Sequence, residues 1–90
     1  MMTSDQSNQR IDYISRAPEA AREQYEEELS AIYAALSLDD VSKAFELIEL
    51  LIQKISASLR SMELHSDEYG DLHLLWERLS DTRLGIRLGT

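Results

Sequence analysis

Histidine and glutamate side chains are the groups of this chain whose types and spacing suggest chemistry. His73 and Glu77 stand four positions apart, so a helix would place them on one face as half of a possible metal site. A structural or catalytic zinc site needs three or four convergent ligands, and this chain has no cysteine to supply a thiolate. We therefore interpret His73 and Glu77 as solvent-facing side chains and predict no metal and no other cofactor.

The second candidate is a run of acids formed by Glu19, Glu23, Glu26, Glu27 and Glu28. Paired carboxylates act as acid and base only inside a cleft that shifts the pKa of one of them, and a helical chain of 90 residues has little room for such a cleft. The sequence also lacks a glycine-rich phosphate loop, an H-E-x-x-H motif and a G-x-S-x-G motif. We therefore predict no enzymatic activity. Glu23, Glu26 and Glu27 are predicted to be a solvated face or a docking surface for a basic partner.

Composition and charge narrow the class of protein further. Hydrophobic residues make up 43% of the chain and charged residues 29%, which is typical of one globular domain. The net charge of −8 disfavours binding to nucleic acids or anionic membranes, because both require an excess of Lys and Arg. No run reaches the roughly 18 apolar residues of a membrane span, and no secretory signal pattern is visible. Together with the absence of cysteine, these features are typical of a cytoplasmic protein.

Hydrophobic periodicity predicts an all-α fold in which three helices form one domain over residues 11–90. Residues 1–10 are polar and aperiodic, and we predict that they form a flexible tail. The third helix is expected to begin after Ser66 or Asp71, both of which can cap a helix, and to end near Gly85. The first two predicted helices cover residues 18–36 and 40–63. The short break between them predicts a central antiparallel helical hairpin.

The second predicted helix carries more apolar side chains than one helical face can bury. Leu47 widens its inward stripe, and Leu50 falls on roughly the opposite side of a helix with 3.6 residues per turn. The inward stripe consists of Val41, Ala44, Phe45, Ile48, Leu51, Ile52, Ile55, Leu59 and Met62. A helix that is apolar on two sides needs two partners. We therefore predict that Leu47, Leu50 and Leu51, with Leu74 of the third helix, bind a second chain.

These patterns predict a non-catalytic protein–protein interaction module, such as a small bacterial adaptor, chaperone or inhibitor. It would present an apolar helix face rimmed by Glu23, Glu26 and Glu27 to another protein, or to a second copy in a homodimer that forms a larger bundle. The alternative function is an acidic mimic that blocks a basic, nucleic-acid-type groove on a partner protein. The net-positive segment around Arg83 is expected to attract the acidic first helix, within one molecule or between two.

Residues 35–55, ALSLDDVSKAFELIELLIQKI, contain the turn of the predicted hairpin. In its helical periodicity this stretch resembles the small helical chaperones of flagellar and type III export. It shares no specific motif with them, so the resemblance identifies no family.

Overall fold

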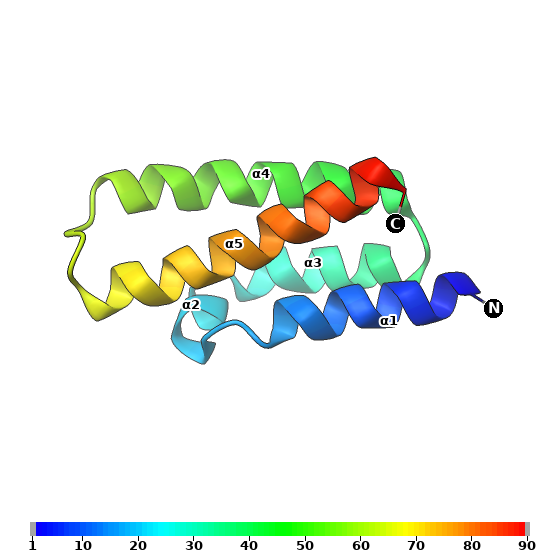
Figure 1. The fold of residues 1–90 in the computed structure, drawn as a ribbon, viewed down its shortest axis with the longest axis horizontal. Coiled ribbons are helices and arrows are strands. Elements are labelled where there is room, and N and C mark those ends of the chain that lie inside the picture. Colours follow the sequence, from blue (N-terminus) through cyan, green and yellow to red (C-terminus); the bar gives the residue numbers. More distant parts are fainter. Residues whose placement is uncertain (1, 90) are drawn as a thin grey trace.

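The computed structural model describes the backbone of residues 2–89 and the side chains of residues 8–89. Within this part of the chain the secondary structure is helical, with no strand, which confirms the prediction of an all-α fold. The described helices are α1 (Met2–Ser15), α2 (Glu19–Gln24), α3 (Glu26–Ser37), α4 (Val41–Arg60) and α5 (Asp67–Leu88) (Figure 1). None of them combines the length and the apolar character that a membrane span requires.

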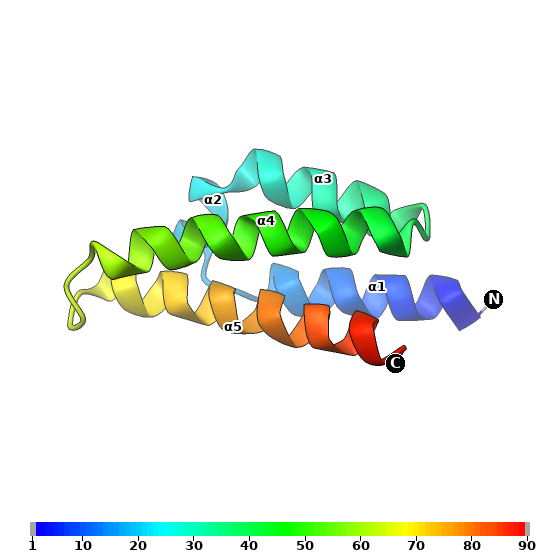
Figure 2. The same ribbon diagram turned by 90° about the horizontal axis from the view of Figure 1, so that it is seen from above.

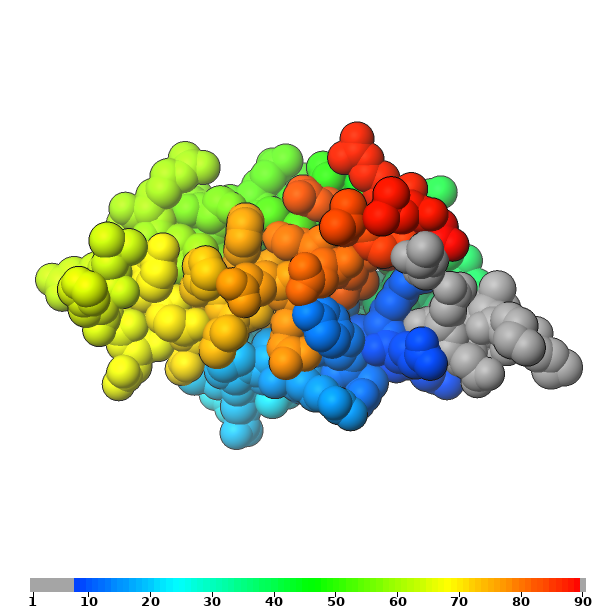
Figure 3. Space-filling model, in the orientation of Figure 1, coloured from blue at the N-terminus to red at the C-terminus, as the bar shows by residue number. Residues whose placement is uncertain are grey.

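The four longer helices run alternately in opposite directions along one axis. In Figures 1 and 2, α1 runs from the right end to the left, α3 returns to the right, α4 runs back and α5 returns again. The main contacts join α1 to α3, α3 to α4, α4 to α5 and α5 to α1, which closes an up-and-down four-helix bundle of 43 × 21 × 20 Å. Figure 3 shows α5 crossing one face of this bundle between α4 and α1.

The helix predicted over residues 18–36 is two helices. Tyr25 has φ −124° and ψ 33°, outside the helical region, and separates α2 from α3. The Tyr25 hydroxyl lies 3.1 Å from the Ser58 hydroxyl oxygen on α4, so the residue at the break is anchored to a neighbouring helix. The sequence hides this break, because Ala21, Tyr25 and Leu29 keep helical spacing across it.

Helix α1, which completes the four-helix bundle, is the element that the sequence did not predict. Residues 2–10, for which a flexible tail was predicted, have a helical backbone continuous with residues 11–15. Near the end of α1, Ile14 is fully buried, and Ala17 is buried just after it. Two isoleucines three positions apart, Ile11 and Ile14, are too short a repeat to predict a helix over this polar segment, which explains why the pattern alone missed it.

Polar contacts hold the same part of α1 onto α5. The Tyr13 hydroxyl donates a hydrogen bond of 2.6 Å to Asp81 Oδ2, and this hydrogen bond to a carboxylate raises the Tyr13 pKa. The Arg78 guanidinium lies 4.5 Å from the centre of the Tyr13 ring and donates to the Tyr13 carbonyl oxygen at 2.9 Å. These contacts fix the position of α1 against the face of α5.

Side-chain caps set the starts of α4 and α5. Asp40 Oδ1 accepts from the Lys43 amide at 3.2 Å, and Ser66 Oγ accepts from the Tyr69 amide at 3.1 Å. Ser66, rather than Asp71, is therefore the cap of α5. The end of α5 lies beyond the predicted Gly85: the helix runs to Leu88 and ends at Gly89, whose φ of 76° suits a C-terminal glycine.

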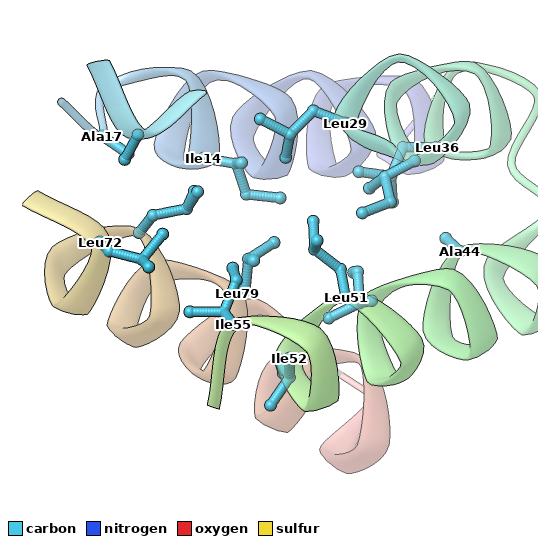
Figure 4. Close-up of a cluster of buried hydrophobic side chains, with 14 of the residues drawn as sticks. Ile14, Ala17, Leu29, Leu36, Ala44, Leu51, Ile52, Ile55, Leu72 and Leu79 are labelled. Carbon is cyan, nitrogen blue, oxygen red and sulfur yellow. The ribbon is translucent and has the colours of Figure 1, made fainter. Parts of the chain in front are cut away.

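The core lies along the axis of the bundle. Figure 4 shows Ile14, Leu51 and Leu79, from three different helices, directed into the space between the helices. The fully buried large side chains are Ile14, Ile32, Leu36, Ile48, Leu51, Ile55, Leu72, Leu75 and Leu79. The α4 members of this set belong to the stripe that the sequence predicted to face inward.

Candidate protein-interaction surface

Helix α4 buries one face in the core and leaves part of a second face open beside α3. Leu51 is 1% exposed, whereas the neighbouring Leu50 is 52% exposed and Leu47 is half-buried. The difference follows from helix geometry, because Leu50 and Leu51 point about 100° apart around the axis. The prediction that α4 is apolar on more than its core face therefore has a structural counterpart, a half-exposed leucine next to a buried one.

A groove of about 660 Å³ lies along this open face between α3 and α4, called here the α3–α4 groove. Buried Leu51 forms part of its floor, while Leu47 and Leu50 contribute from α4 and Ala31 from α3. The full lining is Glu27, Glu28, Ala31, Leu47, Leu50, Leu51, Gln53 and Lys54. The structure thus brings the predicted partner-binding residues Leu47, Leu50 and Glu27 to one place. The prediction that Leu51 binds a partner is wrong, because this side chain is buried in the core.

Charged side chains lie at the end of the groove near the start of α3. Lys54 Nζ lies 2.9 Å from Glu28 Oε2 and joins α4 to α3. The hydrogen bond from Lys54 lowers the Glu28 pKa, and the same bond raises the Lys54 pKa. The neighbouring Glu27 is exposed and makes no ion pair with any residue of the described chain. Glu27 is therefore available to a cation from outside.

The remaining predicted site residues lie elsewhere. Glu23 and Glu26 line a separate, polar groove of about 520 Å³ with Arg22 and Tyr33, whose pKa is raised by burial. Leu74 is 47% exposed on α5 and does not line the α3–α4 groove. The groove is thus rimmed by Glu27 and Glu28 rather than by the whole acidic segment.

His73 and Glu77 form a local contact on the surface of α5. His73 Nδ1 lies 3.6 Å from Glu77 Oε1. The His73 ring also stacks with the rings of Tyr69 and Trp76, with distances between ring centres of 5.9 Å and 5.7 Å. Trp76 Nε1 donates to Ser56 Oγ on α4 at 3.0 Å, which anchors this stack to the bundle. Among residues 8–89, no three His, Asp or Glu side chains converge as a metal site would require.

The expected attraction between Arg83 and the acidic first helix is wrong within one molecule. Arg83 Nη1 lies 3.3 Å from Glu49 Oε1 of α4. Of the predicted acidic helix, α5 packs mainly against α2, and Arg83 forms its ion pair with α4 instead. The basic residue of α5 that reaches an N-terminal helix is Arg78, through Tyr13 of α1.

Sequence reasoning missed two features of the groove. Ala31 was not among the predicted partner-binding residues, although it is exposed and lines the groove. The pairing of Lys54 with Glu28 joins residues 26 positions apart, so no local pattern signals it.

The chain has no significant match to a protein-family model, a curated protein or a solved structure.

Proposed function

We propose that this protein is a non-catalytic interaction module, such as a small adaptor, chaperone or inhibitor, and that the α3–α4 groove binds another protein chain. The observation that carries the proposal is the half-exposed Leu50 above the buried Leu51, within a groove that Leu47 and Ala31 also line. Covering the exposed half of a leucine contributes roughly 1 kcal/mol, and a bound chain would cover Leu47 as well. Apolar side chains gathered in a groove are typical of sites that bind a partner helix.

The electrostatic setting of the groove adds specificity to this apolar contact. Glu27 is exposed without an ion pair in the described chain, whereas Glu28 already binds Lys54. A partner that places a basic side chain beside its apolar residues would therefore complement the end of the groove near Glu27. Contacts of this kind set orientation and partner choice more than affinity.

A matched pair of variants tests the role of the groove. Leu50→Asp and Leu74→Asp introduce the same charge at positions of similar exposure, 52% and 47%, but only Leu50 lines the groove. Proteins from the native host that bind the immobilised wild-type chain should be lost with Leu50→Asp and retained with Leu74→Asp. Circular dichroism must show that both variants keep their helicity. If the two variants capture the same proteins as the wild type, the groove is not the interaction surface.

The second candidate function is an acidic mimic that occupies a basic groove on a partner protein. The observation in its favour is the polar groove beside α2, which Glu19, Glu23 and Glu26 line together. Salt separates the two candidates, because exposed charges are screened over about 10 Å at 0.1 M ionic strength. Binding through acids should weaken strongly as salt rises, whereas binding through Leu47 and Leu50 should change little.

A further inference from the structure

We propose that the occupant of the α3–α4 groove is a second copy of this chain, related to the first by a two-fold axis parallel to the bundle. The inference rests on the proposed function, since it assigns a partner to the same groove. Its basis is a match between the outward-facing rows of α3 and α4.

The outward row of α3 consists of Glu27, Ala31 and Ala34 and continues to Leu38, the residue directly after the helix, at spacings of 4, 3 and 4 residues. Glu27, Ala31, Ala34 and Leu38 are all exposed, Leu38 at 80%. The outward row of α4 consists of Lys43, Leu47, Leu50 and Lys54, with the same spacings. Lys43, Leu50 and Lys54 are exposed, and Leu47 is half-buried. Each row therefore offers side chains that its own bundle leaves partly uncovered.

The contact between Lys54 and Glu28 sets the relative level of the two rows along the bundle axis. Because α3 and α4 run in opposite directions, residue numbers increase along the α3 row in the direction in which they decrease along the α4 row (Figure 2). Glu27 then lies near the level of Lys54, and Ala31 lies near the level of Leu50, with which it lines the groove. By the same count, Ala34 shares a level with Leu47, and Leu38 with Lys43.

A two-fold axis parallel to the helices preserves these levels and exchanges the two rows. It places α3 of one copy over α4 of the other, so that every contact occurs twice. Glu27 then faces Lys54 of the second copy, which joins opposite charges. The small side chains of Ala31 and Ala34 receive the leucines of the opposing α4, in the manner of a knob that fits a hole.

Charge complementarity favours a second copy over an unrelated helix. The groove carries acid on its α3 side and base on its α4 side, and a rotated copy presents the same two signs in exchanged positions. An unrelated helix would have to supply a base for Glu27 and tolerate Lys43 and Lys54 along one short face. The net charge of −8 on each copy opposes association at long range. Salt screens this repulsion and the Glu27–Lys54 attraction alike, so the affinity of the dimer should depend little on salt.

The size of the surface predicts a weak dimer. Helix α3 has 12 residues and is about 18 Å long, which limits the length of the shared face. Such a face lies at or below the low end of specific interfaces, about 1,200 Å² of total buried surface. We therefore expect dissociation constants in the micromolar range or above.

Two single charge reversals test the contact and its symmetry together. Glu27→Lys alone brings the introduced lysine against Lys54 at both symmetry-related contacts of its own dimer, and Lys54→Glu alone places two pairs of acids in contact. Each variant should dimerise roughly tenfold more weakly than the wild type, since each of two like-charge contacts costs about threefold in affinity. In an equimolar mixture of the two variants, the heterodimer contains one native contact between Glu27 and Lys54 and one contact in which both charges are reversed. Its dissociation constant should therefore return to within about threefold of the wild-type value.

Sedimentation equilibrium measures these dissociation constants. Glu77→Lys on α5 is the control for net charge, because it makes the same change as Glu27→Lys away from the groove, and it should not weaken the dimer. Circular dichroism must show that every variant remains folded. Restoration in the mixture supports the proposal, and a dimer that neither reversal weakens, or that the mixture fails to restore, overturns it.

A wild-type chain that remains monomeric at millimolar concentration also overturns the second-copy inference. In that case, specific loss of captured proteins with Leu50→Asp would still support the groove as a site for a different chain. If Leu50→Asp changes neither self-association nor capture, the proposed function fails together with this inference.

Discussion

Two aspartate substitutions within one turn of α4, at Leu50 and Ile52, should have opposite consequences for folding. Ile52 is 5% exposed and belongs to the core, so Ile52→Asp removes a buried side chain that contributes about 1.5–3 kcal/mol. It also places an unpaired carboxylate among apolar neighbours, at a cost of several kcal/mol. The sum approaches the whole free energy of unfolding expected for a chain of 90 residues, about 5–13 kcal/mol. Ile52→Asp should therefore be largely unfolded at 25 °C.

Leu50→Asp should remain folded under the same conditions. Leu50 is 52% exposed, so the substitution loses about half of a leucine burial, roughly 1 kcal/mol, and its charge stays in water. Urea unfolding monitored by circular dichroism at 222 nm measures both variants against the wild type. The assignment of one core face and one open face to α4 would be refuted if both variants lost similar stability.

Three further substitutions test contacts between helices. Arg83→Glu should place like charges at Glu49, so amide exchange in the last turns of α5 should accelerate, with exchange in the centre of α4 unchanged. Tyr13→Phe removes the hydrogen bond that joins α1 to α5 and should lower the free energy of unfolding by about 0.5–1.5 kcal/mol, measured by urea unfolding. Glu28→Gln should be less stable than the wild type at neutral pH. Because the folded-state pKa of Glu28 is lowered, the difference in urea midpoint should shrink as the pH falls below the ordinary value of 4.5. Because the folded-state pKa of Lys54 is raised, the difference in urea midpoint between the wild type and Glu28→Gln should also shrink at high pH, as the pH rises above 10.5. A difference that is constant across these ranges would exclude a stabilising charge pair.

The fold was predictable where one face of a helix repeats apolar residues over several turns. Ala44, Ile48 and Ile55 were predicted to face inward from their spacing, and all three are buried. The break at Tyr25 was not predictable, because it depends on a contact with Ser58 on another helix. Helix α1 was missed for a related reason, since its place in the bundle depends on tertiary contacts rather than on a continuous apolar stripe.

The candidate groove was predictable in part. The position of Leu50 around the axis of α4 indicated an open apolar face, and the structure places a groove there. The rim was not predictable, because the pairing of Glu28 with Lys54 depends on how α3 and α4 align. Glu26 belongs to the same run of acids as Glu27, yet it points to a different groove because adjacent residues of a helix diverge by about 100°.

An isotope-filtered nuclear Overhauser experiment on a mixture of labelled and unlabelled chains tests the second-copy inference most directly. The filter removes contacts within one chain, so methyl signals of Leu50 in one copy report only on atoms of the other. At concentrations where the chain is dimeric, we predict cross-peaks between the Leu50 methyl groups and the Ala31 methyl group of the other copy. Cross-peaks between chains that involve Leu74 of α5 instead, with none at Leu50, would contradict the proposal.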